Sequence, residues 1–305
     1  MTLAEAILLT IITASTPLLL AAIGELVVER SGVLNLGVEG MMIMGAACGI
    51  AAAITTGSSA IGVAAAVAAG MAMAALFAAL TLGLAANQVA SGLALAIFGT
   101  GLSGVIGSGF VGVQRAGIGK LEVPFLSEIP VLGPILFRQD PFVYAAFALV
   151  IGVAWFLSRT RTGLVLRACG ENHAAAHALG YPVLRIRLLA VLFGGACAGL
   201  AGAYISLVLT PFWSSGMTGG RGWIALAIVV FASWKPWRAV LGAYLFGGIT
   251  ILQLHAQGMG VRLPSQLLAA MPYLVTILVL VLIMRARRGG SAAPASLATP
   301  FVPDR

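Results

Sequence analysis

Residues 157–185 read Leu157-Ser-Arg-Thr-Arg-Thr-Gly-Leu-Val-Leu-Arg-Ala-Cys-Gly-Glu-Asn-His-Ala-Ala-Ala-His-Ala-Leu-Gly-Tyr-Pro-Val-Leu-Arg185, and they separate two long hydrophobic runs. Five of the chain's 17 Lys and Arg residues lie in or just after this stretch: Arg159, Arg161, Arg167, Arg185 and Arg187. Basic residues beside membrane spans gather on the cytoplasmic side. Within the stretch, Glu171 to Leu179 predicts a short helix that ends at Gly180 and Pro182. The pattern therefore predicts a short helix on the inner face of a membrane, held between two spans, on which a soluble protein can push.

The composition places the chain in a membrane. Hydrophobic residues make up 60% of its 305 residues and charged residues 9%, against roughly 25% charged residues in a soluble domain. Several apolar runs reach the ~20 residues that cross the hydrocarbon core as a helix. A membrane barrel would instead show segments of about ten alternating residues, and that alternation is missing. We therefore predict an all-α polytopic membrane protein, in which the net charge of +8 sets orientation and does not indicate nucleic-acid binding.

The apolar runs predict about eight to nine transmembrane helices. The expected spans are 6–23, 40–56, 60–84, 89–112, 140–157, 184–209, a broken pair within 222–256, and 266–284. The pair is broken by Trp234-Lys-Pro-Trp-Arg238. The basic residues of 159–187, of this turn and of 285–288 then share one side, which predicts a cytoplasmic C-terminus and an external N-terminus. Three basic residues in the external loop 114–140 argue against this orientation.

One transmembrane domain is expected over 1–288, with a cytoplasmic loop at 159–187. The remaining residues, 289–305, consist mostly of small residues and prolines that cannot build a core. They predict a disordered cytoplasmic tail.

The sequence offers little for catalysis within the chain. His173 and His177 are four residues apart, but Ala174 stands where a metalloprotease motif needs glutamate and a third ligand is not evident. We therefore expect a polar contact surface there and no metal. Neither a phosphate loop nor a plausible Ser, His and Asp triad is present, and the three cysteines indicate no disulfide framework. The chain is not expected to be an enzyme, and it is not expected to hydrolyse ATP itself.

A second polar region, Gly24 to Gly40, lies between the first two apolar runs. Its Glu29 and Arg30 are placed to pair, and its asparagine and glycines suit an unwound backbone. Such a backbone at membrane depth is tolerated only inside protein or beside a cavity, and charged groups there are usually functional. An ordinary cytoplasmic loop explains the region equally well.

Smaller polar breaks occur at 87–91 and at 211–221. Together with the second polar region they supply the candidate residues of a translocation path: Asn35, Glu39, Asn87, Gln88 and Arg221. For each break a simple turn is an equally good interpretation.

Three segments resemble the permease subunits of bacterial ATP-binding cassette (ABC) importers that serve branched-chain amino acids, ribose and nucleosides. They are Glu29-Arg-Ser-Gly-Val-Leu-Asn-Leu-Gly-Val-Glu-Gly-Met-Met42, Arg167-Ala-Cys-Gly-Glu-Asn-His-Ala-Ala-Ala-His-Ala-Leu-Gly-Tyr181 and Met217-Thr-Gly-Gly-Arg-Gly-Trp-Ile-Ala-Leu-Ala-Ile-Val230. The first and third are most similar to the nucleoside, or simple sugar, branch. The resemblance extends over nearly the whole chain.

The resemblance implies a type II-like importer bundle in a bacterial inner membrane. It implies that Arg167 to Tyr181, here called the coupling segment, docks on the ATPase through family-pattern residues. Those residues are Arg167, Gly170, Glu171, Asn172, Ala175, Leu179 and Gly180. The implied partners are an ABC ATPase that carries ATP and Mg²⁺, a second permease that is homologous or identical, an extracytoplasmic solute-binding protein and membrane lipid. The implied cargo is a nucleoside or simple sugar.

Two other kinds of transporter remain as alternatives. A secondary transporter driven by an ion gradient would need ionisable groups within the membrane, for which Glu39 alone is a poor candidate. A passive channel would have no use for the coupling segment.

Overall fold

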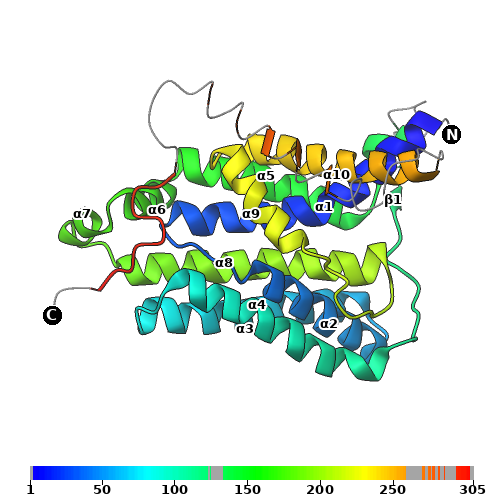
Figure 1. The fold of residues 1–305 in the computed structure, drawn as a ribbon, viewed down its shortest axis with the longest axis horizontal. Coiled ribbons are helices and arrows are strands. Elements are labelled where there is room, and N and C mark those ends of the chain that lie inside the picture. Colours follow the sequence, from blue (N-terminus) through cyan, green and yellow to red (C-terminus); the bar gives the residue numbers. More distant parts are fainter. Residues whose placement is uncertain are drawn as a thin grey trace.

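The computed structural model describes residues 3–122, 124, 133–258, 293–302 and a few positions between 270 and 285. Within these residues the chain is a bundle of mostly parallel and antiparallel long helices (Figure 1). Seven of the described helices are long and apolar enough to cross a membrane. The predicted class, an all-α polytopic membrane protein, is confirmed.

The elements follow one another in this order. The first part of the chain forms α1 (Leu3–Arg30), α2 (Val38–Thr56), α3 (Ser59–Ala78), the π-helical turn η1 (Ala79–Gly83), α4 (Gln88–Gly107) and the 3-10 turn η2 (Ser108–Phe110). Next come β1 (Leu121–Glu122), the π-helical turn η3 (Gly133–Phe137) and β2 (Arg138–Gln139), and the two strands pair antiparallel. The second part forms α5 (Pro141–Arg159), α6 (Arg161–Glu171), α7 (His173–Ala178), α8 (Val183–Tyr204), the π-helical turn η4 (Ile205–Leu209), α9 (Arg221–Ala232) and α10 (Pro236–Gly258).

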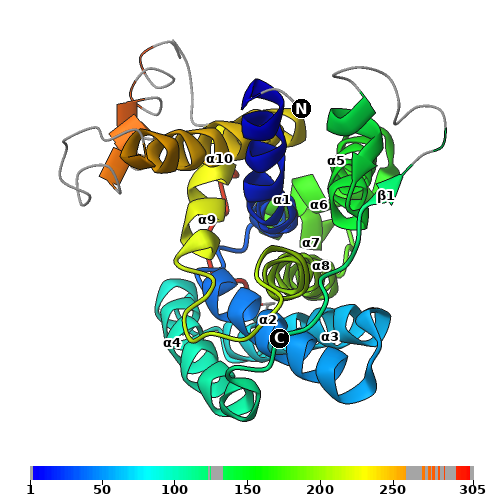
Figure 2. The same ribbon diagram turned by 90° about the vertical axis from the view of Figure 1, so that its right-hand side faces the viewer.

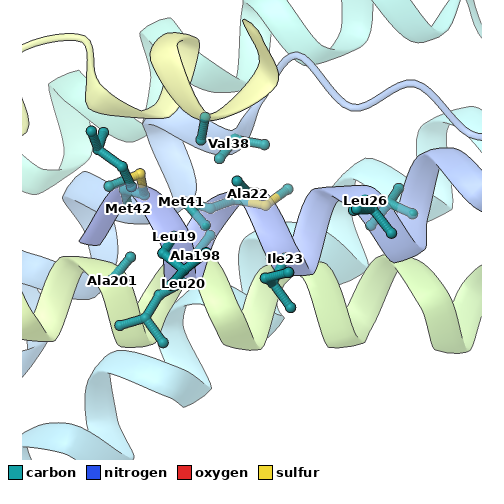
Figure 3. Close-up of a cluster of buried hydrophobic side chains, with 14 of the residues drawn as sticks. Leu19, Leu20, Ala22, Ile23, Leu26, Val38, Met41, Met42, Ala198 and Ala201 are labelled. Carbon is teal, nitrogen blue, oxygen red and sulfur yellow. The ribbon is translucent and has the colours of Figure 1, made fainter. Parts of the chain in front are cut away.

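Helix α8 lies at the centre of the bundle, between α1 on one side and α2 and α3 on the other (Figure 2). One part of the core joins α1, α2 and α8, and includes Leu19, Ile23, Met42 and Ala198 (Figure 3). Large apolar side chains also cover the outside, such as Ile97 and Leu189. Lipid tails solvate an apolar exterior as favourably as the protein core does. The helices are therefore held together by close packing and not by the hydrophobic effect.

Close fit between α8 and its neighbours depends on small residues. A methyl group added at Gly199 would collide with the backbone of α3, at the Ala66 carbonyl oxygen and 3.1 Å from the Val67 Cα. On the other side, a Cβ at Gly45 of α2 would lie only 2.6 Å from the Gly199 Cα. Backbones of three helices therefore meet at this point.

Replacing Gly199 with valine is expected to force these helices apart and to cost about 1–3 kcal/mol or more of stability. The measurement is the thermal unfolding midpoint of detergent-purified protein, followed with a thiol-reactive dye. Cys169 and Cys197 are buried free thiols that unfolding exposes. Gly101→Val is the matched control, because a Cβ at Gly101 has no neighbour within 4 Å. Equal midpoints for the two variants would contradict the packing argument.

The helix boundaries agree with the expected spans, with informative exceptions. Helix α1 continues past the expected end to Arg30, so Glu25 and Glu29 are helical and only 31–37 is unwound. The predicted break at Trp234 is confirmed, because α9 ends at Ala232 and α10 begins at Pro236. Most of the expected last span, 266–284, lies outside the described residues.

The prediction of one helix from Glu171 to Leu179 is wrong. Glu171 is the last residue of α6, and Asn172 adopts an extended conformation that separates α6 from α7. The expectation of a disordered tail also differs from the structure at 293–302. These residues have defined turns and hydrogen bonds to the coupling segment, while 289–292 and 303–305 lie outside the described residues.

Candidate functional site: the coupling segment and the interrupted helices

Two side-chain caps shape α6 and α7, the helices that carry the coupling segment. The hydroxyl of Thr160 accepts a hydrogen bond from the Gly163 amide (2.9 Å) at the start of α6. The Asn172 side chain accepts one from the Ala175 amide (2.9 Å) at the start of α7. Such caps satisfy amides that have no partner within their own helix. Gly180, with φ of 85°, then ends the segment in the left-handed conformation that glycine adopts without strain. Local sequence therefore fixes both ends of α7.

Helix α7 has one anchored face and one free face. Ala176 is buried with Cys169 of α6 and Val183 of α8. Ala175 and Leu179 are exposed, and the Leu179 side chain is 77% accessible. An apolar side chain this exposed at the tip of a polar loop is suited to contact another protein.

Gly170 connects the coupling segment to the end of α1. A Cβ at Gly170 would collide with the Arg30 carbonyl oxygen and lie 3.2 Å from the Gly32 amide nitrogen. The side chains add little to this contact, because Arg30 and Glu171 approach only to 4.0 Å and Glu171 is largely exposed. Arg167 is half-buried nearby, with a buried Nε that has no hydrogen-bond partner among the described residues. The backbones at Gly170, Arg30 and Gly32 therefore touch directly.

The unwound segment 31–37 begins at this contact and leads into the bundle (Figure 1). Two of its amides donate to side chains of neighbouring helices. The Leu34 amide donates to Gln88 Oε1 (2.8 Å), and the Asn35 amide donates to Glu25 Oε1 (3.1 Å). The Asn35 side chain accepts from the Gly37 amide (2.9 Å). Asn35 and Gln88 thus lie at the same unwound segment, but both are buried and hold backbone, and Glu25 is a member that the sequence did not reveal.

Glu39 caps a helix that is far away in sequence. Its Oε1 accepts from the Thr218 hydroxyl (2.6 Å) and the Gly220 amide (2.9 Å), and its Oε2 accepts from the Gly222 amide (2.7 Å). Gly220 is the N-cap residue of α9 and has no side-chain oxygen of its own. A carboxylate at a helix N-terminus satisfies free amides and complements the positive end of the helix dipole.

This cap lies inside the bundle. Helix α9 has 12 residues and spans about 18 Å, well short of the ~30 Å hydrocarbon core. Its other end adjoins α1, where Trp234 donates its indole N–H to Glu29 (2.6 Å) and its carbonyl accepts from Arg30 (3.1 and 3.2 Å). The expected pairing of Glu29 with Arg30 is thus replaced by separate bonds to Trp234. Helices α2 and α9 both begin at an intermediate depth of the bundle.

The other two candidate path residues, Arg221 and Asn87, bind backbone groups close to them in sequence. Arg221, between the two glycines that bind Glu39, donates to the carbonyls of Met217 (3.0 Å) and Thr218 (3.2 Å). Asn87 is exposed and caps α4 through the Ala90 amide (3.0 Å). The five candidates therefore fall into three groups: Asn35 with Gln88, Glu39 with Arg221, and Asn87 alone. Across the described residues no cluster of three metal-ligating side chains is found.

A bundle with seven described helices that can cross a membrane, with interrupted helices inside it and a capped helix at the tip of one loop, is that of a polytopic membrane protein. The chain belongs to the family described as the branched-chain amino acid transport system / permease component, whose model matches residues 7–284. It is the membrane-spanning, non-enzymatic permease subunit of an ABC importer, and ATP hydrolysis belongs to a separate subunit.

Similar proteins include permeases whose names state a substrate. The putative glucose ABC transporter permease protein TsgC13 of Haloferax volcanii is 41% identical, with 92% of each chain covered. The nucleoside ABC transporter permease protein NupC of Lactococcus lactis is 32% identical over 88% of this chain and 89% of the relative. The guanosine ABC transporter permease protein NupQ of Bacillus subtilis is 31% identical over 94% of this chain and 93% of the relative. No solved structure matches the chain.

Proposed function

We propose that this permease imports a neutral, hydroxylated solute, a simple sugar or a nucleoside, and that an ATPase drives it through the coupling segment. The similarity to a glucose permease and to two nucleoside permeases supports this cargo class. So does the use of charge within the described bundle. Glu39, Glu29 and Arg221 bind groups of the protein itself, which leaves them poorly placed to neutralise a charged solute.

The observation that carries the drive mechanism is the backbone contact between Gly170 and the Arg30–Gly32 corner. When the ATPase moves α7, Gly170 presses on the corner where α1 ends and the unwound segment begins. That segment leads directly to α2, whose Glu39 holds the start of α9. Packed backbones transmit displacement because they have little free volume to absorb it. A push at the loop end thus reaches the interrupted helices in the middle of the bundle.

The assembly that follows has four kinds of component. The permease pairs with a homologous or identical permease, two ATPase domains bind ATP and Mg²⁺ and face the coupling segments, and an extracytoplasmic binding protein delivers the solute. The arginines of 159–187 support a cytoplasmic position for the coupling segment and the C-terminus, in the inner membrane of a bacterium. Switching of access then follows the ATP-dependent state of the ATPases.

The cargo proposal is tested on the solute-binding protein that works with this permease. We expect calorimetry to show saturable binding of either glucose or a nucleoside such as guanosine, and the bound solute to compete for ATP-dependent uptake in proteoliposomes. Leucine is the control solute, because the family name includes branched-chain amino acids. Binding of leucine without binding of sugar or nucleoside would contradict the proposal.

A further inference from the structure

The C-terminal residues 293–302 lie against the coupling segment, beside α6 and the start of α8 (Figure 1). The Ser296 amide donates to the Gly170 carbonyl (2.9 Å), and its hydroxyl donates to the Glu171 carbonyl (3.2 Å). The Ala295 amide donates to the Glu171 carboxylate (3.3 Å). The chain end therefore returns to the same glycine that touches α1.

The buried guanidinium of Arg187 binds three separate parts of the chain. Its side chain is fully buried, and its guanidinium donates to the carbonyls of Ser31 (3.1 Å) and Thr299 (3.2 Å). A third bond goes to Nδ1 of His173 (3.3 Å). Because a guanidinium only donates, His173 must accept, which requires a neutral imidazole. Burial and the Arg187 charge both lower the pKa of His173 and favour that form.

Phe301 packs against α7 from the side. Its ring centroid lies 5.1 Å from that of His173 and 5.3 Å from that of His177. It also packs against the small cluster of Cys169, Ala176 and Val183. The face of α7 that carries Ala175 and Leu179 stays exposed. The C-terminal residues therefore support α7 without covering its free face.

Helix α7 depends on such contacts to stay ordered. Helix α7 has six residues, and an isolated helix of that length is not stable in water. A helix that must transmit a push needs contacts that keep it ordered. Removing the chain end would also take one acceptor from a buried cation, and such a loss is costly.

We propose that residues 293–302 form a strap that, with Arg187 as a positioning residue, holds α7 in the orientation in which the ATPase engages it. The proposal rests on the proposed function for its consequence in transport. The strap itself is a property of the permease alone, so the two are tested separately.

The test uses the full-length permease and the variant Phe301→Ala. Val302→Ala is the matched control, because Val302 is the neighbouring residue and its side chain is 69% exposed. The first measurement is hydrogen exchange of the 173–180 amides in the permease alone. We expect exchange about tenfold faster in Phe301→Ala, and no change in Val302→Ala. Unchanged exchange in Phe301→Ala would overturn the strap.

The second measurement is solute imported per ATP hydrolysed in the reconstituted importer. We expect this ratio to fall by about tenfold in Phe301→Ala and to stay normal in Val302→Ala. Faster exchange with a normal ratio would overturn the positioning role. If the wild-type permease binds no ATPase, the proposed function fails while the exchange result still decides the strap. Arg187→Gln is expected to reproduce both effects. If Arg187→Gln does not fold, the result for Phe301→Ala alone decides whether the strap positions α7.

Discussion

Replacing Leu179 with glutamate is expected to lower ATP-dependent uptake by more than about tenfold while the permease stays inserted and folded. The Leu179 side chain is 77% exposed at the end of α7 and supports no described core cluster. Burying a leucine side chain in an interface contributes about 1.5–3 kcal/mol. Placing a carboxylate there removes this contribution and adds a desolvation cost. A loss of about 1.4 kcal/mol of binding free energy corresponds to a tenfold weaker association.

The measurements are uptake in proteoliposomes, ATP hydrolysis, and recovery of the ATPase with tagged permease. Leu121→Glu is the control, since the Leu121 side chain is also exposed (51%) but lies in β1, on the external loop of the predicted topology. We expect the control to retain the ATPase. Normal uptake per ATP in Leu179→Glu would show that α7 is not the docking element.

Replacing Glu39 with alanine is expected to abolish uptake and to lower the thermal unfolding midpoint of the permease. The change leaves three donors without their acceptor: the Thr218 hydroxyl and the amides of Gly220 and Gly222. Each buried donor without a partner costs about 1–3 kcal/mol, and the half-buried site places the cost near the lower end. The start of α9 then loses its position against α2.

Glu39→Gln gives a graded test of the same contact. Its amide oxygen can still accept from Thr218 and Gly220, but its NH₂ group would face the Gly222 amide. We expect the unfolding midpoint and uptake to rank wild type above Gln and Gln above Ala. Glu122→Ala is the control, because its ion pair with Arg138 is exposed and worth little. A Glu39→Ala protein as stable as the control would contradict the capping role.

Sequence predicted the spans well because lipid imposes a strong composition on each of them. The break at Trp234 was predictable for the same reason, since Lys235, Pro236 and Arg238 interrupt the apolar run of α9. The local caps of the coupling segment were also readable. Thr160 and Asn172 each stand immediately before a helical run, and recognising Asn172 as a cap would have separated α6 from α7.

The role of Glu39 could not be read in this way. Its partners lie about 180 residues further along the chain, and two of them are backbone amides that any residue provides. One indirect signal existed, because α9 begins after Gly220, which offers no side-chain cap. A helix that starts inside a membrane without its own cap needs an acceptor from elsewhere.

Composition alone does not indicate the contacts that residues 293–302 make. Small residues and prolines do not build a core of their own, yet Ser296 and Phe301 bind to surfaces that α6 and α7 already present. Arg187 likewise appears in the sequence as one orienting arginine among five, while the fold buries it completely. Composition describes what a segment can build alone, and these residues depend on what the rest of the chain supplies.

The central claim is that a separate ATPase drives this permease through α7, and site-specific photo-cross-linking tests it most directly. A photoreactive amino acid is placed at position 179 in the assembled importer, and a second sample carries it at position 121. The account predicts an adduct between position 179 and the ATPase, with none from position 121. ATP-driven uptake without any adduct from position 179 would contradict the account, as would uptake that survives removal of the ATPase and stops when an ion gradient collapses.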